Sequence, residues 1–261
     1  MFIGSPRRLA FAGLAAASLC FGAAPAMAQS QALSPEQRKA VVELIRETLM
    51  KNPDLVMDAL YEHERRSQEA QLAAQRKAIS DVATLVDPAT SIIAGNPKGD
   101  VTLIEFMDYN CGFCKRGLED VVALVKADPN LKVVVKDFPF LGPGSEEASR
   151  VAFAAKKQLS GERYWDFHLK LMRSKGQMNF ARALEIARES GADVARLKKD
   201  AETDEVREAI GKVVELGRQI GIQGTPAYVV GDELVSGAVG EAVLKQKIDS
   251  VRKCGKTDCS G

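Results

Sequence analysis

The chain has 261 residues, enough for one sizeable core and a small second module, and too many for a mini-protein that depends on disulfides. It carries 36 Lys and Arg residues against 35 Asp and Glu residues, so its formal net charge is +1. Because no stretch concentrates positive charge, the composition argues against a nucleic-acid-binding protein. We therefore expect no nucleic acid among its partners.

The first 28 residues have the pattern of a cleavable export signal. Arg7 and Arg8 supply positive charge, an apolar stretch runs from Leu9 to Ala24, and Ala26-Met27-Ala28 gives a small-x-small cleavage site. An uncleaved membrane anchor is the alternative, but the apolar stretch is short and rich in alanine. We expect cleavage after Ala28 and a periplasmic protein.

Residues 29–86 are expected to form a helical segment that assembles the protein. Ser34-Pro35-Glu36-Gln37 predicts a capped helix start, and Asn52-Pro53-Asp54 interrupts the pattern and restarts it. Both helices carry apolar residues at helical spacing: Val41, Val42, Ile45 and Leu49, then Leu55, Val56, Ala59 and Leu60.

These apolar stripes need a docking partner, because helices this short are not stable alone. One alternative is the catalytic domain of the same chain. The polar run 61–77 favours a second copy instead, since it would act as a semi-rigid spacer. The sequence therefore predicts a homo-oligomer.

Residues 87–261 are expected to form an α/β domain with a thioredoxin-like fold. After a loop-rich boundary, the apolar run 101–106 suits a strand covered on both faces. A helix at 111–126 and a β-branched strand at 131–135 complete a parallel βαβ unit.

A helical insertion at about 144–220 interrupts this fold. Helices are expected at 146–157, 162–173, 181–189 and 194–219. They are followed by short strands at 227–230 and 233–236 and a helix at 241–251.

Four cysteines remain after signal cleavage, in two close pairs, and disulfides persist outside the cytosol. Cys111 is expected at the exposed start of a helix, where backbone N–H groups and the helix dipole favour its thiolate. Cys111 is therefore the expected nucleophile, and Cys114 the interior thiol that resolves a mixed disulfide.

A plain structural disulfide, or a zinc site shared with Cys254 and Cys259, is the alternative for the C-x-x-C pair. The export signal and the strand-to-helix setting favour redox use. We expect Cys254 and Cys259 to form a local structural disulfide, and we expect no metal and no cofactor.

Two further positions are expected to serve the redox pair. Glu105 lies in the apolar strand; if buried, it would have a raised pKa and could exchange a proton with Cys114. The alternative is an edge-strand acid that points to solvent. Thr225-Pro226 opens a later strand, and a cis bond there would leave an unpaired backbone edge for an extended substrate segment. The expected substrate contacts are Thr225, Gly112 and Phe113.

These motifs resemble the DsbA-type branch of the thioredoxin superfamily and, within it, the ScsC (suppressor of copper sensitivity protein C) group. The matching segments are 106–114, with Cys111-Gly112-Phe113-Cys114, then Lys136-Asp137-Phe138-Pro139, the helical insertion and Gly224-Thr225-Pro226-Ala227. The resemblance covers about residues 90–252, and the helices from Ser34 onward are similar to the oligomerisation segment of that group. It implies a nucleophilic Cys111, a resolving Cys114, a cis-Pro226 and a proton-exchanging Glu105.

One departure from the family pattern bears on activity. Gly112-Phe113 stands between the cysteines, where strong oxidases of this branch carry Pro-His. Without an imidazole beside Cys111, the resemblance implies a disulfide isomerase or reductase for exported proteins with cysteines. It also implies a membrane thiol–disulfide reductase as electron donor, and a homo-oligomer such as a trimer. A DsbA-like dithiol oxidase and a copper-tolerance module that binds Cu(I) through soft thiolates are the competing interpretations.

Overall fold

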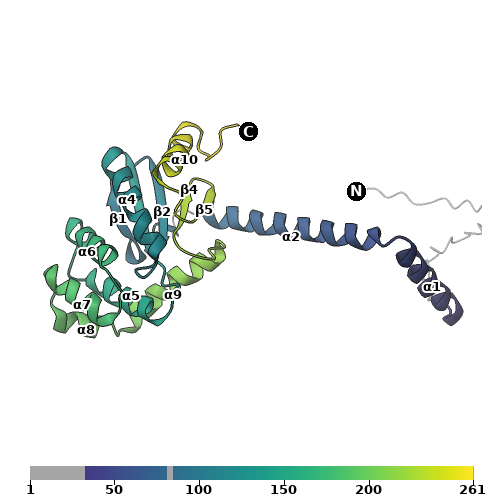
Figure 1. The fold of residues 1–261 in the computed structure, drawn as a ribbon, viewed down its shortest axis with the longest axis horizontal. Helices are drawn as coiled ribbons and strands as arrows, with labels where there is room; N and C mark the ends of the chain where they lie inside the picture. Colours follow the sequence, from purple (N-terminus) through teal and green to yellow (C-terminus); the bar gives the residue numbers. More distant parts are fainter. Residues whose placement is uncertain (1–32, 81–84, 261) are drawn as a thin grey trace, which may run out of the picture. The chain divides into compact units, whose positions relative to one another are not determined.

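The computed structural model describes residues 33–80 and 85–260 (Figure 1). The export signal expected at 1–28 lies outside the described residues. The chain divides into two units, residues 1–60 and 61–261. Across the described residues, no helix is both long and apolar enough to cross a membrane.

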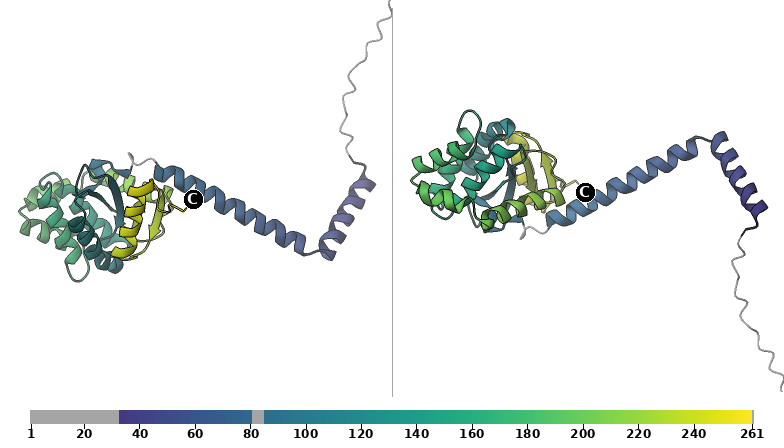
Figure 2. Two further views of the ribbon diagram at one scale, coloured as in Figure 1. Left: turned by 90° about the horizontal axis from the view of Figure 1, so that it is seen from above. Right: turned by 90° about the horizontal axis from the view of Figure 1, so that it is seen from below.

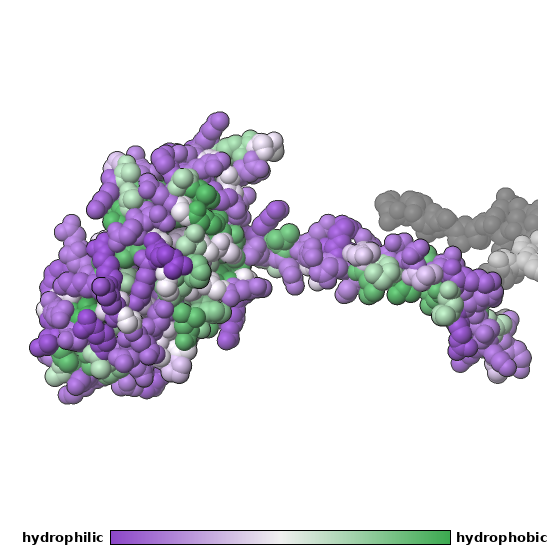
Figure 3. All heavy atoms as spheres, in the orientation of Figure 1, coloured by the Kyte–Doolittle hydropathy of each residue, from purple (hydrophilic) through white to green (hydrophobic). Residues whose placement is uncertain are grey.

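The first unit consists of α1 (Pro35–Lys51) and the start of α2 (Asp54–Ser80). Ser34 caps α1 as expected: its hydroxyl accepts from the Gln37 N–H at 3.2 Å, and the Gln37 side chain accepts from the Ser34 N–H at 2.9 Å. No residue of α1 is buried. Green, hydrophobic residues therefore lie among the purple, polar ones on the surface of these helices (Figure 3).

Helix α2 continues without a break through the polar run 61–77. Arg65 and Arg66 form ion pairs with Glu62 at helical spacing, and Arg65 also pairs with Glu69. Such pairs support a helix that buries little. The run is therefore a regular helix rather than a loosely helical linker.

A five-stranded sheet with the order β1-β3-β2-β4-β5 organises the second unit (Figures 1 and 2). Its strands are β1 (Ile92–Gly95), β2 (Val101–Met107), β3 (Leu131–Asp137), β4 (Ala227–Val230) and β5 (Glu233–Ser236). Only β2 and β3 are parallel; the other neighbouring pairs are antiparallel. The parallel pair and the helix between them are the predicted βαβ unit.

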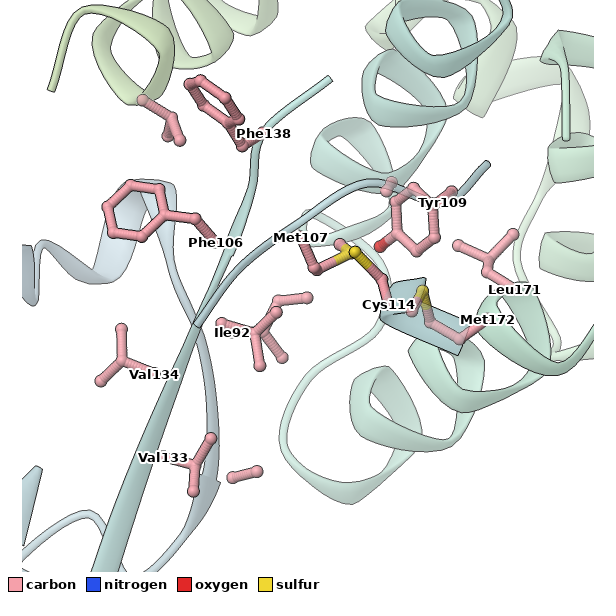
Figure 4. Packing of buried hydrophobic residues seen from close by; sticks show 14 of the residues in the cluster. Ile92, Phe106, Met107, Tyr109, Cys114, Val133, Val134, Phe138, Leu171 and Met172 are labelled. Atoms are coloured by element: carbon pink, nitrogen blue, oxygen red, sulfur yellow. The ribbon is translucent and has the colours of Figure 1, made fainter. Parts of the chain in front are cut away.

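Helices cover both faces of this sheet. The helices of this part of the chain are η1 (Pro88–Thr90, a 3-10 helix), α4 (Gly112–Ala127), α5 (Pro143–Ala155), α6 (Glu162–Arg173), α7 (Phe180–Glu189), α8 (Val194–Asp200), α9 (Asp204–Gln219) and α10 (Glu241–Cys254). Helices α7 and α8 pack against α5. Helices α4 and α10 pack together on one face. On the other face α9 lies against Phe138, which makes an edge contact with Phe106 (Figure 4).

Two expected elements differ from the structure. The loop-rich boundary contains β1, which pairs with β3. This four-residue strand ends on Gly95 and is too short to show alternation in the sequence. The helix expected at 194–219 is two helices, α8 and α9. They are separated because Thr203 has extended backbone angles and donates its hydroxyl to the Asp200 carbonyl at 2.8 Å, a local bond that competes with helix continuation.

Candidate active site

Strand β2 delivers the first cysteine to the start of α4. Cys111 is the N-cap residue, and its Sγ accepts a hydrogen bond from the Cys114 N–H at 3.2 Å. The Cys111 N–H in turn donates to the Asp108 carbonyl at 3.0 Å, which closes the turn between strand and helix. The sulfur therefore occupies the position where free N–H groups and the helix dipole favour a negative charge.

Both thiols are free and buried, which corrects the expectation of an exposed Cys111. Cys111 is 5% exposed and Cys114 is fully buried. The cover comes from the segment before β4, because the Cys111 Sγ donates to the Thr225 carbonyl at 3.2 Å. The Thr225–Pro226 peptide bond is cis, and the Thr225 hydroxyl oxygen is buried with no hydrogen-bond partner among the described residues.

The two thiols differ in pKa rather than in burial. The pKa of Cys111 is lowered to about 6, chiefly because the Cys114 thiol donates a hydrogen bond to it. The same bond, together with burial, raises the pKa of Cys114. Cys111 is therefore the sulfur that ionises near neutral pH, and Cys114 holds its proton.

Glu105 is buried in the centre of β2, at 1% exposure. Burial raises the pKa of its carboxyl to about 8, a hydrogen bond with the Tyr228 side chain lowers it, and the charge of Cys111 raises it. Its Oε1 has no hydrogen-bond partner among the described residues. An acid with such a pKa, within electrostatic reach of Cys111, can take up or release a proton near neutral pH.

Asp108, which the sequence analysis did not single out, anchors the active-site turn. Its fully buried carboxylate accepts from the Asn110 N–H and the Ser145 hydroxyl at 2.7 Å each, and from the N–H groups of Phe140 and Leu141 at 2.7 and 2.9 Å. Four donors satisfy the charge. Its position could have been noticed in the sequence, because Asp108 is a polar residue directly after the buried strand β2.

Asn110 ties the same turn to the helical insertion. Its side chain accepts from the Met178 N–H at 2.6 Å and donates to the Met178 carbonyl at 2.9 Å. The residue directly before Cys111 is thus held by a segment 68 residues away. Nothing in the local sequence signals this contact.

Of the expected substrate contacts, Gly112 and Phe113 are exposed beside the buried thiols, whereas Thr225 is half-buried. Phe113 is 60% exposed, and the Arg116 guanidinium lies 4.2 Å from its ring centroid. Phe140 and Leu141, bound to Asp108 through their N–H groups, are also half exposed. The site therefore offers an apolar rim next to the covered Cys111 sulfur.

The second cysteine pair lies at the C-terminal end of α10, the last helix of the domain. Cys254 and Cys259 are bonded to each other, with an S–S distance of 2.08 Å. Over residues 33–80 and 85–260, no three His, Cys, Asp or Glu side chains are grouped so that they could hold a metal ion.

Comparison with known families agrees with this geometry. The DSBA-like thioredoxin domain matches residues 102–249, and the copper resistance protein ScsC N-terminal domain matches residues 37–70. A thioredoxin-like oxidoreductase from Silicibacter pomeroyi DSS-3 is 42% identical, over 66% of this chain and 97% of that chain, with a TM-score of 0.62. A linker-deletion mutant of Proteus mirabilis ScsC is 29% identical, over 86% of this chain and 99% of that chain, with a TM-score of 0.64.

Curated relatives are more distant. The probable disulfide bond formation protein D of Bacillus anthracis is 24% identical over 170 residues, which are 61% of this chain and 77% of that protein. The Na(+)/H(+) antiporter NhaA 1 of Salinispora arenicola is 24% identical over 66% of this chain, but the match spans only 26% of the antiporter.

The DsbA-like model covers more than half of the chain and includes all of β2 after its first residue, Cys111, Cys114 and Pro226. The Silicibacter pomeroyi protein is matched over nearly its whole length. The chain therefore belongs to the DsbA-like thioredoxin family, a family of thiol–disulfide oxidoreductases, and carries an N-terminal segment of the ScsC type.

Proposed function

We propose that this protein is a periplasmic disulfide isomerase and reductase that acts on exported proteins with cysteines. One observation carries the proposal: the Cys111 thiolate is stabilised by a neutral thiol and by backbone, with a pKa of about 6. Thioredoxin, a reductant, has a corresponding pKa near 7, and DsbA, a strong oxidant, one near 3.5. Because a lower thiolate pKa stabilises the reduced pair, a Cys111 thiolate that is held by a backbone N–H and has no charged partner favours reductant or isomerase work over strong oxidation.

The active-site cations do not change this assignment. The Lys115 ammonium donates to the Ser174 carbonyl at 2.8 Å, and the Arg116 guanidinium faces the Phe113 ring. The causes that lower the pKa of Cys111 are the hydrogen bond from the Cys114 thiol, which is the largest, and the backbone donors at the start of α4, and neither cation is among them. The thiolate is thus moderately rather than strongly stabilised.

Catalysis begins when the Cys111 thiolate attacks a substrate disulfide. A bond forms between the Cys111 Sγ and one substrate sulfur, and the other substrate sulfur leaves as a thiolate with the electron pair of the broken bond. In isomerisation, a substrate thiolate later attacks the mixed disulfide and expels Cys111. A different substrate disulfide results, without net transfer of electrons.

In reduction, Cys114 resolves the mixed disulfide. The Cys114 thiol gives its proton to the Glu105 carboxylate and its sulfur attacks the Cys111 Sγ, so that the Cys111–Cys114 bond forms and the substrate thiolate leaves. Two electrons pass to the substrate. A membrane thiol–disulfide reductase is the proposed donor that returns two electrons to the oxidised pair.

Assembly through α1 and the start of α2 is part of the same proposal. The stripe residues of α1 are 40–55% exposed, and Leu55, Val56 and Leu60 of α2 are 44–55% exposed, so both helices present a large apolar surface. The match of residues 37–70 to the ScsC N-terminal domain supports a homo-oligomer, with a trimer as one arrangement. Several active sites would then share one substrate, which raises the effective thiolate concentration.

Paired assays on the exported form test the activity. One assay follows the rescue of a scrambled-disulfide protein, and the other follows the oxidation of the same protein from its reduced state. Rescue much faster than oxidation is the expected result, and the reverse would establish a dithiol oxidase. A reduced protein that binds Cu(I) tightly and rescues nothing would favour the copper-tolerance interpretation.

Light scattering tests the assembly. Ile45→Glu places a charge in the α1 stripe, whereas Arg46→Glu changes a neighbouring residue whose side chain is 67% exposed. We expect Ile45→Glu to give monomers and Arg46→Glu to leave the oligomer intact. A monomeric unmodified protein would contradict the assembly.

A further inference from the structure

Tyr228 is the polar neighbour of Glu105 within the sheet. The two residues are directly paired between β4 and β2, so their side chains share one face. On the other side, the partner of Glu105 in β3 is Val135. Along β2, the next residues on this face are Leu103 and Met107. Of these lateral neighbours, Tyr228 alone carries a hydrogen-bonding side chain.

The Tyr228 hydroxyl is enclosed between the sheet and α4. Tyr228 is 1% exposed, and a Cβ added to Gly117 would lie 2.9 Å from its hydroxyl oxygen. A buried tyrosine hydroxyl requires a hydrogen-bond partner. Glu105 lies directly opposite Tyr228 in the sheet and is the polar side chain beside the hydroxyl, and each of the two groups shifts the pKa of the other.

Gly117 gives independent evidence that the fold leaves space for the Tyr228 hydroxyl. It lies in the interior of α4, where glycine is a poor helix former compared with alanine. Its backbone φ is not in the left-handed region, so chain geometry does not require glycine. What requires it is room, because any side chain there would collide with the Tyr228 hydroxyl.

We propose that Tyr228 is a positioning residue for proton exchange between Glu105 and Cys114: its hydroxyl donates to the Glu105 carboxylate and fixes that carboxylate beneath α4, in space that Gly117 leaves open. The inference rests on the proposed function of Glu105. It adds a residue on the substrate-side strand, two positions after Pro226, to the proton-transfer machinery.

The hydroxyl binds the ionised form of Glu105, and this determines whether its removal raises or lowers the pKa of Glu105. A donor stabilises the carboxylate, and this bond lowers the pKa of Glu105 against the effect of burial. The other charged groups that act on Glu105 or Tyr228 are Cys111, Cys114 and Asp120, all of which are negative when ionised. Removal of the hydroxyl therefore raises the pKa of Glu105 and leaves fewer carboxylates at neutral pH.

A single-turnover experiment on the full exported chain tests this. Reduced protein is mixed with oxidised glutathione, and the decay of the Cys111–glutathione mixed disulfide is followed by acid quench and mass spectrometry between pH 5.5 and 9.5. In the wild type, the decay rate should rise with pH as Glu105 ionises. Tyr228→Phe should slow decay at pH 7 about tenfold, which corresponds to about one pKa unit, and the rates should converge above pH 9.

Tyr164→Phe is the matched control. Tyr164 is also buried, and its hydroxyl donates to the Ala152 carbonyl at 2.8 Å, away from Glu105. Its removal should leave the pH profile unchanged. Gly117→Ala, which displaces the Tyr228 hydroxyl, should reproduce the shift of Tyr228→Phe, and the two together should shift no further.

The outcomes distinguish the role of Tyr228 from the role of Glu105. A Tyr228→Phe profile with the wild-type midpoint, or a uniform slowing at every pH, overturns the inference, because only packing would then be lost. Glu105→Gln should abolish the pH-dependent rise. If Glu105→Gln keeps that rise, the proposed function of Glu105 fails; if it abolishes the rise while Tyr228→Phe does not move it, only the role of Tyr228 fails.

Discussion

The two cysteine pairs lie at opposite kinds of helix end. Cys111 caps the N-terminus of α4 and receives an N–H from within the helix. Cys254 is the last residue of α10, where its sulfur lies 3.3 Å from the Ser250 carbonyl and 3.4 Å from the Lys256 carbonyl. Helix N-termini favour a thiolate, and carbonyl-rich C-termini disfavour one.

Spacing adds to this contrast. Cys114 is one turn after Cys111 in the same helix and can alternate between hydrogen-bond donor and covalent partner. Cys259 follows Cys254 beyond the end of α10, and its disulfide fastens the exposed C-terminal segment to that helix. Residue type alone therefore does not determine redox use; the local backbone does.

The largest expected effect tests this division directly. Cys111→Ala should abolish thiol–disulfide exchange, with a loss of at least about a thousandfold, because no other ionised sulfur is available. The double variant Cys254→Ser/Cys259→Ser should keep its activity within about twofold and lose about 2 kcal/mol of stability at most. Insulin reduction and urea unfolding measure the two quantities. Activity lost with the second pair would contradict the contrast.

The redox site should also contribute a pH-dependent instability that the C-terminal pair lacks. The folded-state pKa of Glu105 is about 8, whereas an unfolded glutamate has one of about 4.3. Between these values the folded state holds a proton that the unfolded state has released, so stability falls as pH rises, by up to about 4 kcal/mol at pH 7.

Glu105→Gln removes this titration. The variant should be more stable than the wild type at pH 7 to 8, and the difference should vanish near pH 4. Burial also raises the pKa of Asp137, but that group is present in both proteins and its contribution cancels. Urea unfolding across this pH range measures the difference, and parallel curves for the two proteins would show that Glu105 is not buried as described.

A smaller effect concerns the mutual dependence of the thiols. The hydrogen bond from Cys114 is the leading cause of the low pKa of Cys111, so Cys114→Ala should raise that pKa by about one unit while the backbone donors remain. Mixed disulfides with substrates should also accumulate, because the resolving sulfur is gone. Thiolate absorbance against pH gives the first quantity. An unchanged midpoint would assign the stabilisation to the helix terminus alone.

Sequence patterns predicted what depends on local chemistry. The apolar run of β2, the helix that follows it and the β-branched β3 indicated the βαβ unit, and the cysteine position followed from that unit. Long-range contacts gave no such signal: the hold of Met178 on Asn110 and the placement of Tyr228 beside Glu105 depend on strand register and on loop packing. Exposure of Cys111 was overestimated because the segment that covers it, at Thr225, is 114 residues away.

The smallest expected effect tests whether the packing of α4 depends on the sheet beneath it as well as on the cysteine turn. Two of the glycines inside helices of this domain have contrasting surroundings. A Cβ at Gly211 in α9 would meet nothing within 4 Å, whereas one at Gly117 would lie 2.9 Å from the Tyr228 hydroxyl. Gly211→Ala should therefore stabilise the protein by up to about 1 kcal/mol, the helix-propensity gain, whereas Gly117→Ala should destabilise it by about 1 to 2 kcal/mol through overpacking.

When Tyr228→Phe is combined with Gly117→Ala, the collision is removed and the loss of stability should shrink towards zero. Urea unfolding of the four variants measures this coupling. Additive effects at Gly117 and Tyr228 would mean that the glycine has no steric link to the hydroxyl, and α4 would then owe its position to the cysteine turn alone.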